Sequence, residues 1–272
     1  MKPVDRQTIL ITGATDGIGK LTALELARRQ AHLLVHGRNS EKLARVVAEL
    51  KAASANKNIE GFTADFSSIA QVRRLAGEVL ATYPALDVLI NNAGVGSAEA
   101  RYSADGHELR FAVNYLAPFL LTHLVLPAVK KAAPARIVNV SSAGQYPVDF
   151  DDVMLEKHFD GSRAYSQSKL ALIMFTIDLA AQLTKEQVTV NCLHPGTYLN
   201  TNMVRRAGVT PRGEPQSGAD AVVFLAVSPD VADTTGKYFN VKTEARPNAQ
   251  ADDAQARKRL RELSLKLTGL TQ

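Results

Sequence analysis

The sequence predicts an α/β fold: one domain over residues 1–272, with a doubly wound parallel sheet of about seven strands and helices on both faces. Three observations support this prediction. Short apolar runs alternate with helical periods along the chain, the pattern of right-handed βαβ units. The apolar runs are nearly continuous rather than alternating, as in strands that are covered on both faces. A glycine-rich turn follows the first run, where doubly wound sheets bind nucleotides.

The expected strands are short segments rich in Val, Ile and Leu, bounded by glycine, proline and polar residues. The third is the weakest, because a glutamate and a glycine interrupt its apolar residues. In chain order the expected strands cover residues 9–11, 33–35, 59–63, 88–90, 137–140, 188–193 and 237–241.

The segments between the strands show the 3.6-residue apolar period of helices. Ser40 is the expected N-cap of the second helix, because its hydroxyl can accept a hydrogen bond from the first turn. The last helix is amphipathic and closes the chain. The expected helices cover residues 20–29, 41–53, 69–83, 108–131, 162–184, 217–227 and 254–267.

The expected helix at 162–184 is apolar on two faces, which indicates burial on two sides. One face is expected to pack on the sheet. The other packs either on a second subunit, in a homodimer or homotetramer, or under the chain's own C-terminal segment. The two faces carry Leu172, Phe175 and Leu179, and Leu170, Met174 and Ile177.

The glycine-rich turn reads Thr12-Gly13-Ala14-Thr15-Asp16-Gly17-Ile18-Gly19. Its glycines allow backbone amides to approach a phosphate without a Cβ in the way. The helix that follows offers free N–H groups and the positive end of its dipole to an anion. The turn therefore predicts a phosphate-binding site, although its spacing is G-x-x-x-G-x-G rather than the more familiar G-x-G-x-x-G. The alternative is a glycine turn without a ligand.

The composition argues against several functional classes. The formal net charge is +5 and the pI is about 9.3, but the basic residues are dispersed apart from those at 257–261, so we expect no nucleic-acid partner. Cys192 is the one cysteine and is expected to pack in the core. Single histidines such as His36, His123 and His194 lack metal-ligand spacing; we expect them to be structural, with no metal site.

No part of the sequence has the pattern of a secretion signal or a membrane anchor. The first strand begins near residue 7, too early for a signal peptide to precede it. Polar residues and prolines interrupt the longest apolar segment, residues 111–129, so we expect no membrane-spanning helix. The sequence thus predicts a cytoplasmic protein with no membrane partner.

Four motifs occur in an order that resembles the short-chain dehydrogenase/reductase family. They are the glycine turn, Asn91-Asn92-Ala93-Gly94 after a strand, Ser141-Ser142 followed by Tyr165-Ser166-Gln167-Ser168-Lys169, and Pro195-Gly196 after the sixth strand. Further stretches, at 113–122, 193–196 and 236–239, resemble the retinol dehydrogenase-like branch in a soluble, bacterial-type form. The resemblance implies a Rossmann fold that binds NAD(P).

Tyr165 and Lys169 are four residues apart in an expected helix and so share one face. Because a nearby ammonium stabilises a phenolate, we expect Lys169 to lower the pKa of Tyr165 from about 10. Tyr165 would then be a general acid or base, and Lys169 would also hold the nicotinamide ribose. The alternative is an ordinary surface Tyr/Lys pair.

The resemblance assigns two further catalytic residues. Ser142, in preference to Ser141, would donate a hydrogen bond to the substrate oxygen. Asn114 lies inside an expected helix, where asparagine is unfavourable. The resemblance implies that it anchors a water that links Lys169 to solvent; the alternative is a tolerated buried asparagine. The long connection 143–161 is expected to loop over the site and to shape the substrate pocket.

The resemblance also assigns residues to the cofactor. Arg38 follows the second strand, where an arginine accommodates the 2′-phosphate of NADP, so NADP(H) is preferred and NAD(H) remains possible. Asp16 opposes this preference, and an ordinary surface arginine is the alternative. Asp65 would contact adenine or cap the next helix. The full predicted cofactor set is Gly13, Thr15, Asp16, Gly17, Ile18, Gly19, Arg38, Asp65, Phe66, Asn92, Ala93, Gly94, Tyr165, Lys169, Pro195, Gly196 and Thr197.

These observations predict an NADP(H)-dependent oxidoreductase that transfers a hydride between nicotinamide and a small-molecule carbonyl or alcohol. A moderately lipophilic aldehyde or ketone is the expected substrate, and residues 197–218 are the expected substrate loop. Within it, Thr197 and Thr201 would contact the carboxamide or the pyrophosphate of the cofactor. Two other functions remain open: an NADPH-binding sensor that catalyses nothing, and a reductase of a C=C bond.

Overall fold

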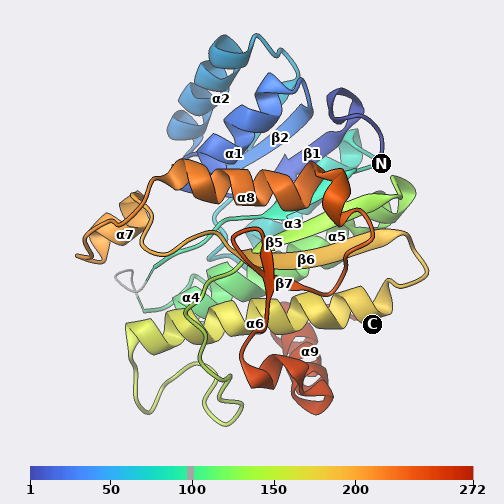
Figure 1. The fold of residues 1–272 in the computed structure, drawn as a ribbon. Helices are drawn as coiled ribbons and strands as arrows, with labels where there is room; N and C mark the ends of the chain where they lie inside the picture. Colours follow the sequence, from blue (N-terminus) through green and yellow to red (C-terminus); the bar gives the residue numbers. More distant parts are fainter. Residues whose placement is uncertain (97–100, 272) are drawn as a thin grey trace.

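The computed structural model describes residues 1–96 and 101–271, and in these residues eight strands form a single sheet (Figure 1). The strand order is β3-β2-β1-β4-β5-β6-β7-β8, parallel except for the β7–β8 pair. The order reverses between β1 and β4, which places a crevice at the carboxyl ends of those two strands. The strands are β1 Thr8–Ile11, β2 His32–Gly37, β3 Ile59–Thr63, β4 Val88–Asn91, β5 Ala135–Val140, β6 Val188–His194, β7 Tyr238–Asn240 and β8 Thr243–Ala245.

The predicted parallel α/β sheet is confirmed, but the sequence did not reveal its edge strand β8. The chain turns back at Val241, which has a φ of +58°, and β8 pairs antiparallel to β7. Its three residues are Thr243, Glu244 and Ala245, which contain no apolar run. An edge strand that is solvated on one side needs no apolar run, so hydrophobic periodicity alone does not reveal it.

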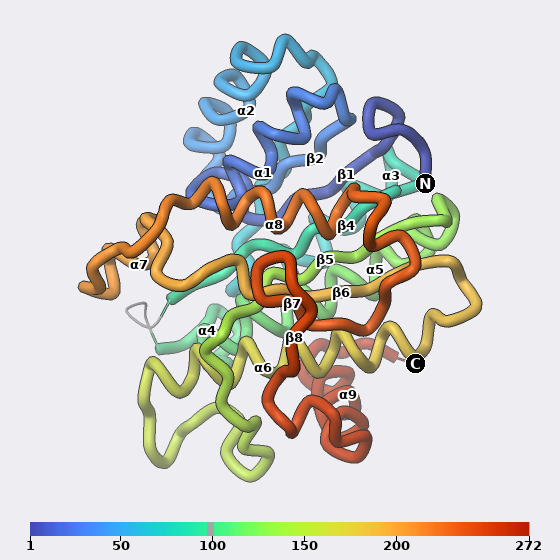
Figure 2. The backbone as a smooth tube through the Cα atoms, in the orientation of Figure 1, coloured from blue at the N-terminus to red at the C-terminus, as the bar shows by residue number. Residues whose placement is uncertain are grey.

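Helices cover both faces of the sheet (Figures 1 and 2). One apolar core lies between the sheet and α1, α2 and α8, and a second lies between the sheet and α3, α5 and α6. The helices are α1 Gly17–Arg28, α2 Ser40–Ser54, α3 Ile69–Thr82, α4 Leu109–Phe111, α5 Ala117–Lys131, α6 Gly161–Gln182, α7 Asn202–Arg206, α8 Pro215–Val227 and α9 Ala254–Thr268.

The N-cap of α2 is Asn39, and the prediction of Ser40 was wrong by one residue. The Asn39 side-chain oxygen accepts a hydrogen bond from the backbone N–H of Lys42 at 2.8 Å. Asparagine and serine are about equally good caps, so adjacent candidates cannot be ranked from sequence.

The predicted single helix 108–131 is three consecutive segments. Between α4 and α5 the chain forms a π-helical turn, Ala112–Leu116, with Asn114 at its centre. Such a turn inserts one residue into a helix and occurs often at functional sites. Because it redirects the side chains that follow, it sets the direction in which Asn114 points.

The stretch Leu109–Lys131 has the length and the mean hydropathy, 1.5, of a membrane-spanning helix, contrary to our expectation. However, 78% of its most apolar window is buried inside the protein. It packs against α3 and α6 as a core helix, so its apolar composition is explained by the fold.

The second apolar face of α6 is covered by α9 (Figure 1). The Tyr115 hydroxyl and the Ser264 hydroxyl are hydrogen-bonded at 2.6 Å inside this contact. Arg261 of α9 forms an ion pair with Asp178 of α6 at 2.8 Å. Of the two partners that the sequence left open for this face, the chain's own C-terminal segment occupies it.

Candidate active site

The glycine turn after β1 is fastened to the loop after β4 by hydrogen bonds. The Thr12 Oγ1 accepts from the backbone N–H groups of Asn92, at 2.9 Å, and Ala93, at 3.0 Å. The Asn92 amide donates to the carbonyls of Thr12, at 2.9 Å, and Gly13, at 3.0 Å. Two of the motifs found in the sequence therefore form one rigid unit at the crevice between β1 and β4.

Two glycines in this unit are required by the close approach of backbone. Gly13 has a φ of +66°, and a Cβ on it would lie 2.6 Å from the Ala93 Cα. A Cβ on Gly19 would collide with the Gly13 carbonyl and the Asn92 amide. The bare backbone thus forms a cradle at the start of α1, which suits a phosphate group.

His36 ties this cradle to the next two strands, a role that the sequence analysis missed. Its Nδ1 accepts from the Gly13 N–H at 3.2 Å, and its Nε2 donates to the Ala64 carbonyl at 2.9 Å. The ring stacks on Phe66, with 4.2 Å between centroids. Burial lowers the pKa of His36 to about 4, so the ring is neutral and holds one tautomer. The only sequence signal was its position two residues before Arg38.

The residues predicted for the adenosine half of the cofactor lie near His36. Arg38 is exposed and, among the described residues, has no hydrogen bond or ion pair. Phe66 is buried against His36. Asp65 accepts from the Ser67 N–H at 2.9 Å, whereas the N-cap of α3 is Ser68, so the alternative of Asp65 as a helix cap was wrong.

Asp16 does not present a free carboxylate to the cofactor. Its Oδ2 accepts from Lys42 Nζ at 2.8 Å and from Asn202 Nδ2 at 2.7 Å, and its Oδ1 accepts from the Gly17 N–H at 2.8 Å. Burial opposes ionisation, but the hydrogen bonds from Lys42, Asn202 and Gly17 outweigh it and lower the pKa of Asp16. The negative charge that argued against NADP is therefore paired.

Ser142, Tyr165 and Lys169 come together at the carboxyl end of β5. The Ser142 and Tyr165 side chains both border Gly144, where a Cβ would lie 3.5 Å from Ser142 Oγ and 3.9 Å from Tyr165 Cε1. The Lys169 Nζ lies 5.8 Å from the centre of the Tyr165 ring. Lys169 is buried and donates to the Val140 carbonyl at 2.9 Å. The structure thus brings together three of the four predicted catalytic residues, from β5 and one face of α6.

The expected lowering of the Tyr165 pKa is wrong for this structure. Burial raises the pKa of Tyr165, partly offset by the hydrogen bond with Ser142. Burial also lowers the pKa of Lys169 to about 8. Low-dielectric surroundings disfavour the charged forms of both groups. Tyr165 is thereby held as a phenol at neutral pH.

The structure distinguishes the two adjacent serines. Ser141 is buried, and its hydroxyl donates to the Lys169 carbonyl at 2.8 Å, which ties β5 to α6. Ser142 is partly exposed, and its Oγ accepts from the Gly144 N–H at 3.1 Å while facing Tyr165. Ser142 is therefore the serine that can reach a substrate oxygen.

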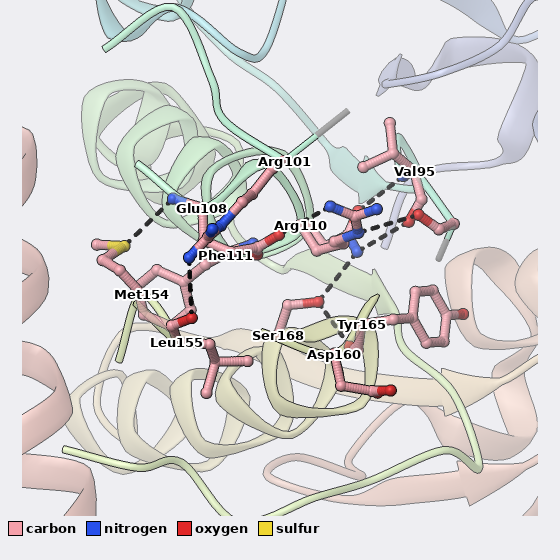
Figure 3. A network of polar contacts seen from close by, with 12 residues as sticks. Val95, Arg101, Glu108, Arg110, Phe111, Met154, Leu155, Asp160, Tyr165 and Ser168 are labelled. Carbon is pink, nitrogen blue, oxygen red and sulfur yellow. Dashed lines mark hydrogen bonds and ion pairs between the residues drawn. The ribbon is translucent and has the colours of Figure 1, made fainter. Parts of the chain in front are cut away.

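Asn114 connects α6 to the loop after β4. Its Oδ1 accepts from the Val95 N–H at 2.8 Å, and its Nδ2 donates to the Val95 carbonyl at 3.1 Å and to the Ser168 Oγ at 3.0 Å. Ser168 in turn donates to the Tyr165 carbonyl at 2.7 Å (Figure 3). A Cβ on Gly94 would lie 3.2 Å from Asn114 Oδ1 and 3.5 Å from Lys169 Nζ, so this glycine separates the two side chains.

A buried ion pair that the sequence analysis did not single out supports the same loop. Glu108 and Arg110 are each 1% exposed and are 3.0 Å apart. The other Glu108 oxygen accepts from the Phe111 N–H at 2.8 Å, and Arg110 Nε donates to the Gly96 carbonyl at 3.2 Å (Figure 3). The helix that carries Asn114 is thus anchored at its start to the loop after β4.

The connection after Ser142 is held by two glutamines. Gln167 of α6 accepts from the Asp149 N–H at 3.0 Å and donates to the Val153 carbonyl at 2.9 Å. Gln250, from the C-terminal segment, accepts from the Val148 N–H at 2.6 Å and donates to its carbonyl at 3.1 Å. The segment that was expected to loop over the site is therefore a fixed wall beside Ser142.

The loop after β6 begins with the predicted Pro195-Gly196-Thr197. The Thr197 hydroxyl is hydrogen-bonded to His194 Nε2 at 3.0 Å, which fixes its position next to the strand end. Thr201 caps α7, with its Oγ1 accepting from the Val204 N–H at 3.4 Å. A Cβ on Gly17 would lie 3.3 Å from the Thr201 Cγ2, so this loop reaches the glycine turn.

A cofactor with phosphates and a ribose fits this set of residues. The glycine cradle and the start of α1 suit a diphosphate, and Arg38 is available for a further anionic group. The Lys169 Nζ lies 5.8 Å from the centre of the Tyr165 ring and could donate to a ribose hydroxyl. The match of the chain to the family model for short chain dehydrogenases, over residues 7–211, agrees with this arrangement.

This chain belongs to the short-chain dehydrogenase family. It is 36% identical to human retinol dehydrogenase 13, in an alignment that covers 97% of this chain and 85% of that protein. It is also 36% identical to human retinol dehydrogenase 14, with 97% and 87% covered.

Solved structures share this fold over most of the chain. An uncharacterised protein from Mycobacterium paratuberculosis superposes with a TM-score of 0.80 at 28% identity, covering 97% of this chain and 94% of that chain. The Pseudomonas aeruginosa RhlG/NADP complex superposes with a TM-score of 0.70 at 27% identity, covering 88% and 97%. As a short-chain dehydrogenase, the protein is an NAD(P)-dependent oxidoreductase that acts on a small-molecule alcohol or carbonyl.

Proposed function

We propose that this short-chain dehydrogenase prefers NADP(H) and interconverts a carbonyl and an alcohol, with Tyr165 as the general acid or base. The observation that carries the proposal is the grouping of Ser142 and Tyr165, whose side chains both border Gly144, with the buried Lys169 Nζ 5.8 Å from the centre of the Tyr165 ring. This arrangement offers one proton donor, one polarising hydroxyl and one cation at a single point of the crevice.

Each of the three side chains has a distinct part in the reduction direction. When bound, the nicotinamide supplies the hydride. Ser142 donates a hydrogen bond to the substrate oxygen, where negative charge develops. Tyr165, which its raised pKa keeps protonated, gives its proton to that oxygen. Lys169, with a pKa of about 8, is mainly charged at pH 7 and stabilises the phenolate that remains. In oxidation the same groups act in reverse.

The preference for NADP(H) rests on charge around the second strand. Arg38 is exposed and unpaired among the described residues, at the position where an arginine accommodates a 2′-phosphate. The carboxylate of Asp16 is paired with Lys42 and so does not repel a phosphate. The RhlG/NADP complex, a structural neighbour, supports the same preference. Arg38→Asp should lower the kcat/KM for NADPH about 100-fold and shift the preference toward NADH; an unchanged NADPH/NADH ratio would refute this assignment.

We propose a cytoplasmic location for the protein. The substrate that we propose is a moderately lipophilic aldehyde or ketone, or the matching alcohol. Relatives named as retinol dehydrogenases support an apolar carbonyl substrate. The exposed aromatic residues Tyr146 and Tyr198 lie on the connections that follow β5 and β6, the edge of the sheet that bears the catalytic groups. These rings are available to contact an apolar substrate.

The test follows the oxidation of NADPH and of NADH over a panel of aldehydes and ketones, with product analysis. Wild-type protein should turn over with NADPH, and Tyr165→Phe should bind NADPH with a similar Kd but lose at least 1,000-fold in kcat. Tyr83→Phe, which removes a tyrosine hydroxyl that bonds Glu60 at the end of α3, is the matched control. Full turnover by Tyr165→Phe would refute the role of this residue. Tight NADPH binding without turnover would favour the sensor, and a saturated C–C product would favour the C=C reductase.

A further inference from the structure

The carboxylate of Asp16 joins three segments that are distant in sequence. It lies in the glycine turn, receives Lys42 of α2 at 2.8 Å, and receives Asn202 of α7 at 2.7 Å. Both contacts are made to the same oxygen, while the other oxygen accepts from the Gly17 N–H. Figures 1 and 2 show α7 at the end of the molecule where α1 begins. The loop after β6 is therefore attached to the phosphate cradle across the crevice.

Apolar packing accompanies this polar contact. A Cβ on Gly17 would meet the Thr201 methyl at 3.3 Å, and a Cβ on Gly96 would meet Met203 Cγ at 3.0 Å. The start of α7 thus touches both the glycine turn after β1 and the loop after β4. These two loops follow the adjacent strands β1 and β4 and are hydrogen-bonded to each other.

The rest of this loop is bonded mainly to itself. Asn200 N–H donates to the Gly213 carbonyl at 2.7 Å, and Arg212 N–H donates to the Tyr198 carbonyl at 2.8 Å. The Arg205 guanidinium donates to the Asn200 side-chain oxygen at 2.7 Å and 2.9 Å. Residues 198–213 consequently form a hydrogen-bonded unit that is fixed at one end by the buried Leu199, which packs beside Gly196 and Gly218. Among the contacts of the described residues, Asn202 makes the side-chain hydrogen bond that joins this unit to the cradle.

We propose that Asn202 and Asp16 form a latch that holds residues 198–213 over the phosphate cradle and slows dissociation of the cofactor. Asn202 is a positioning residue: it restrains the loop and takes no part in proton transfer. Lys42 orients the Asp16 carboxylate toward Asn202 by binding the same oxygen. The effect on cofactor retention rests on the proposed NADP(H)-dependent function, whereas the attachment of the loop does not.

The first test measures the loop in the cofactor-free protein. Hydrogen–deuterium exchange of residues 198–213 should be at least several-fold faster in Asn202→Ala than in the wild type, while α6 and the sheet exchange as before. Asn202→Asp should have a larger effect, because it sets a carboxylate against Asp16. Asn200→Ala is the matched control: it removes an asparagine from the same loop, but one that bonds only Arg205 through its side chain in the contacts described.

The second test measures the dissociation rate of NADPH by displacement, followed by nicotinamide fluorescence. A hydrogen bond to a charged group, partly exposed, predicts about five-fold faster dissociation for Asn202→Ala, with an unchanged rate of hydride transfer in a single turnover. The latch would be overturned if residues 198–213 exchanged in Asn202→Ala at the wild-type rate. It would also be overturned if they exchanged faster but NADPH still dissociated at the wild-type rate. If no variant binds NADPH but exchange rises in Asn202→Ala, the attachment stands and the proposed cofactor is wrong.

Discussion

His36 makes the stability of this protein depend on pH in a window that can be calculated. The imidazole is 3% exposed, accepts from Gly13 and donates to Ala64, and burial lowers its pKa from 6.5 to about 4. In the unfolded chain it would titrate at its ordinary value. Between pH 6.5 and 4 the unfolded state therefore binds a proton that the folded state does not, and stability falls as pH falls.

The size of the effect follows from the two pKa values. The contribution of neutral His36 to the free energy of unfolding is fully present above pH 6.5. It decreases by about 1.4 kcal/mol for each pH unit between pH 6.5 and pH 4. From pH 7 to pH 4.5 the wild type should lose about 2 kcal/mol of unfolding free energy through His36 alone. Other groups titrate in this window too, so the quantity must be isolated by a variant.

His36→Gln is that variant, because glutamine keeps one donor and one acceptor but does not titrate. Urea unfolding of both proteins at pH 7 and at pH 4.5 gives four free energies. The wild type should lose about 2 kcal/mol more than His36→Gln between the two pH values, since His123 and His194 are common to both proteins and cancel. An equal loss in both proteins would refute the inference that His36 is a neutral tie between Gly13 and Ala64.

Two matched pairs test the rest of the site. Gly19→Ala should lower cofactor affinity at least about tenfold, because its Cβ would collide with the Gly13 carbonyl. The control is Gly77→Ala, at an exposed helix position where a Cβ would meet nothing within 4 Å. It should leave cofactor affinity unchanged and add about 0.5–1 kcal/mol of stability. Titration with NADPH and urea unfolding check both, and equal affinities would contradict the cradle. Ser142→Ala should lower kcat about 100-fold with little change in stability, whereas Ser141→Ala should cost about 1 kcal/mol of stability and affect kcat less. The reverse order in steady-state kinetics would assign the substrate contact to Ser141.

The fold was predictable because each parallel strand is covered on both faces and therefore reads as a continuous apolar run. The strands at 9–11 and 88–90 are such runs, and they appear in the structure as β1 and β4. Where burial did not impose a pattern, prediction failed. Strand β8 has no apolar run, and the helix expected at 108–131 contains a π-helical turn whose extra residue leaves no mark in the hydrophobic period.

The candidate site divides in the same way. The glycine turn and the pair Tyr165 and Lys169 are local motifs, because their residues must be close in sequence to share one turn or one helix face. The direction of the Tyr165 pKa shift is not local. It depends on how deeply Tyr165 and Lys169 are buried, and that is set by segments far away in the chain.

The sequence by itself therefore determined the α/β architecture, the family resemblance and the positions of the glycine cradle, Tyr165 and Lys169. Only the tertiary structure decided that Ser141 ties β5 to α6, that His36 ties Gly13 to Ala64, and that Asp16 is paired with Lys42 and Asn202. The physical reason is the distance along the chain over which each effect acts. Periodicity and spacing act between neighbours, whereas burial, charge pairing and the partners of a side chain depend on residues that folding brings together, such as Asp16 and Asn202, which are 186 positions apart.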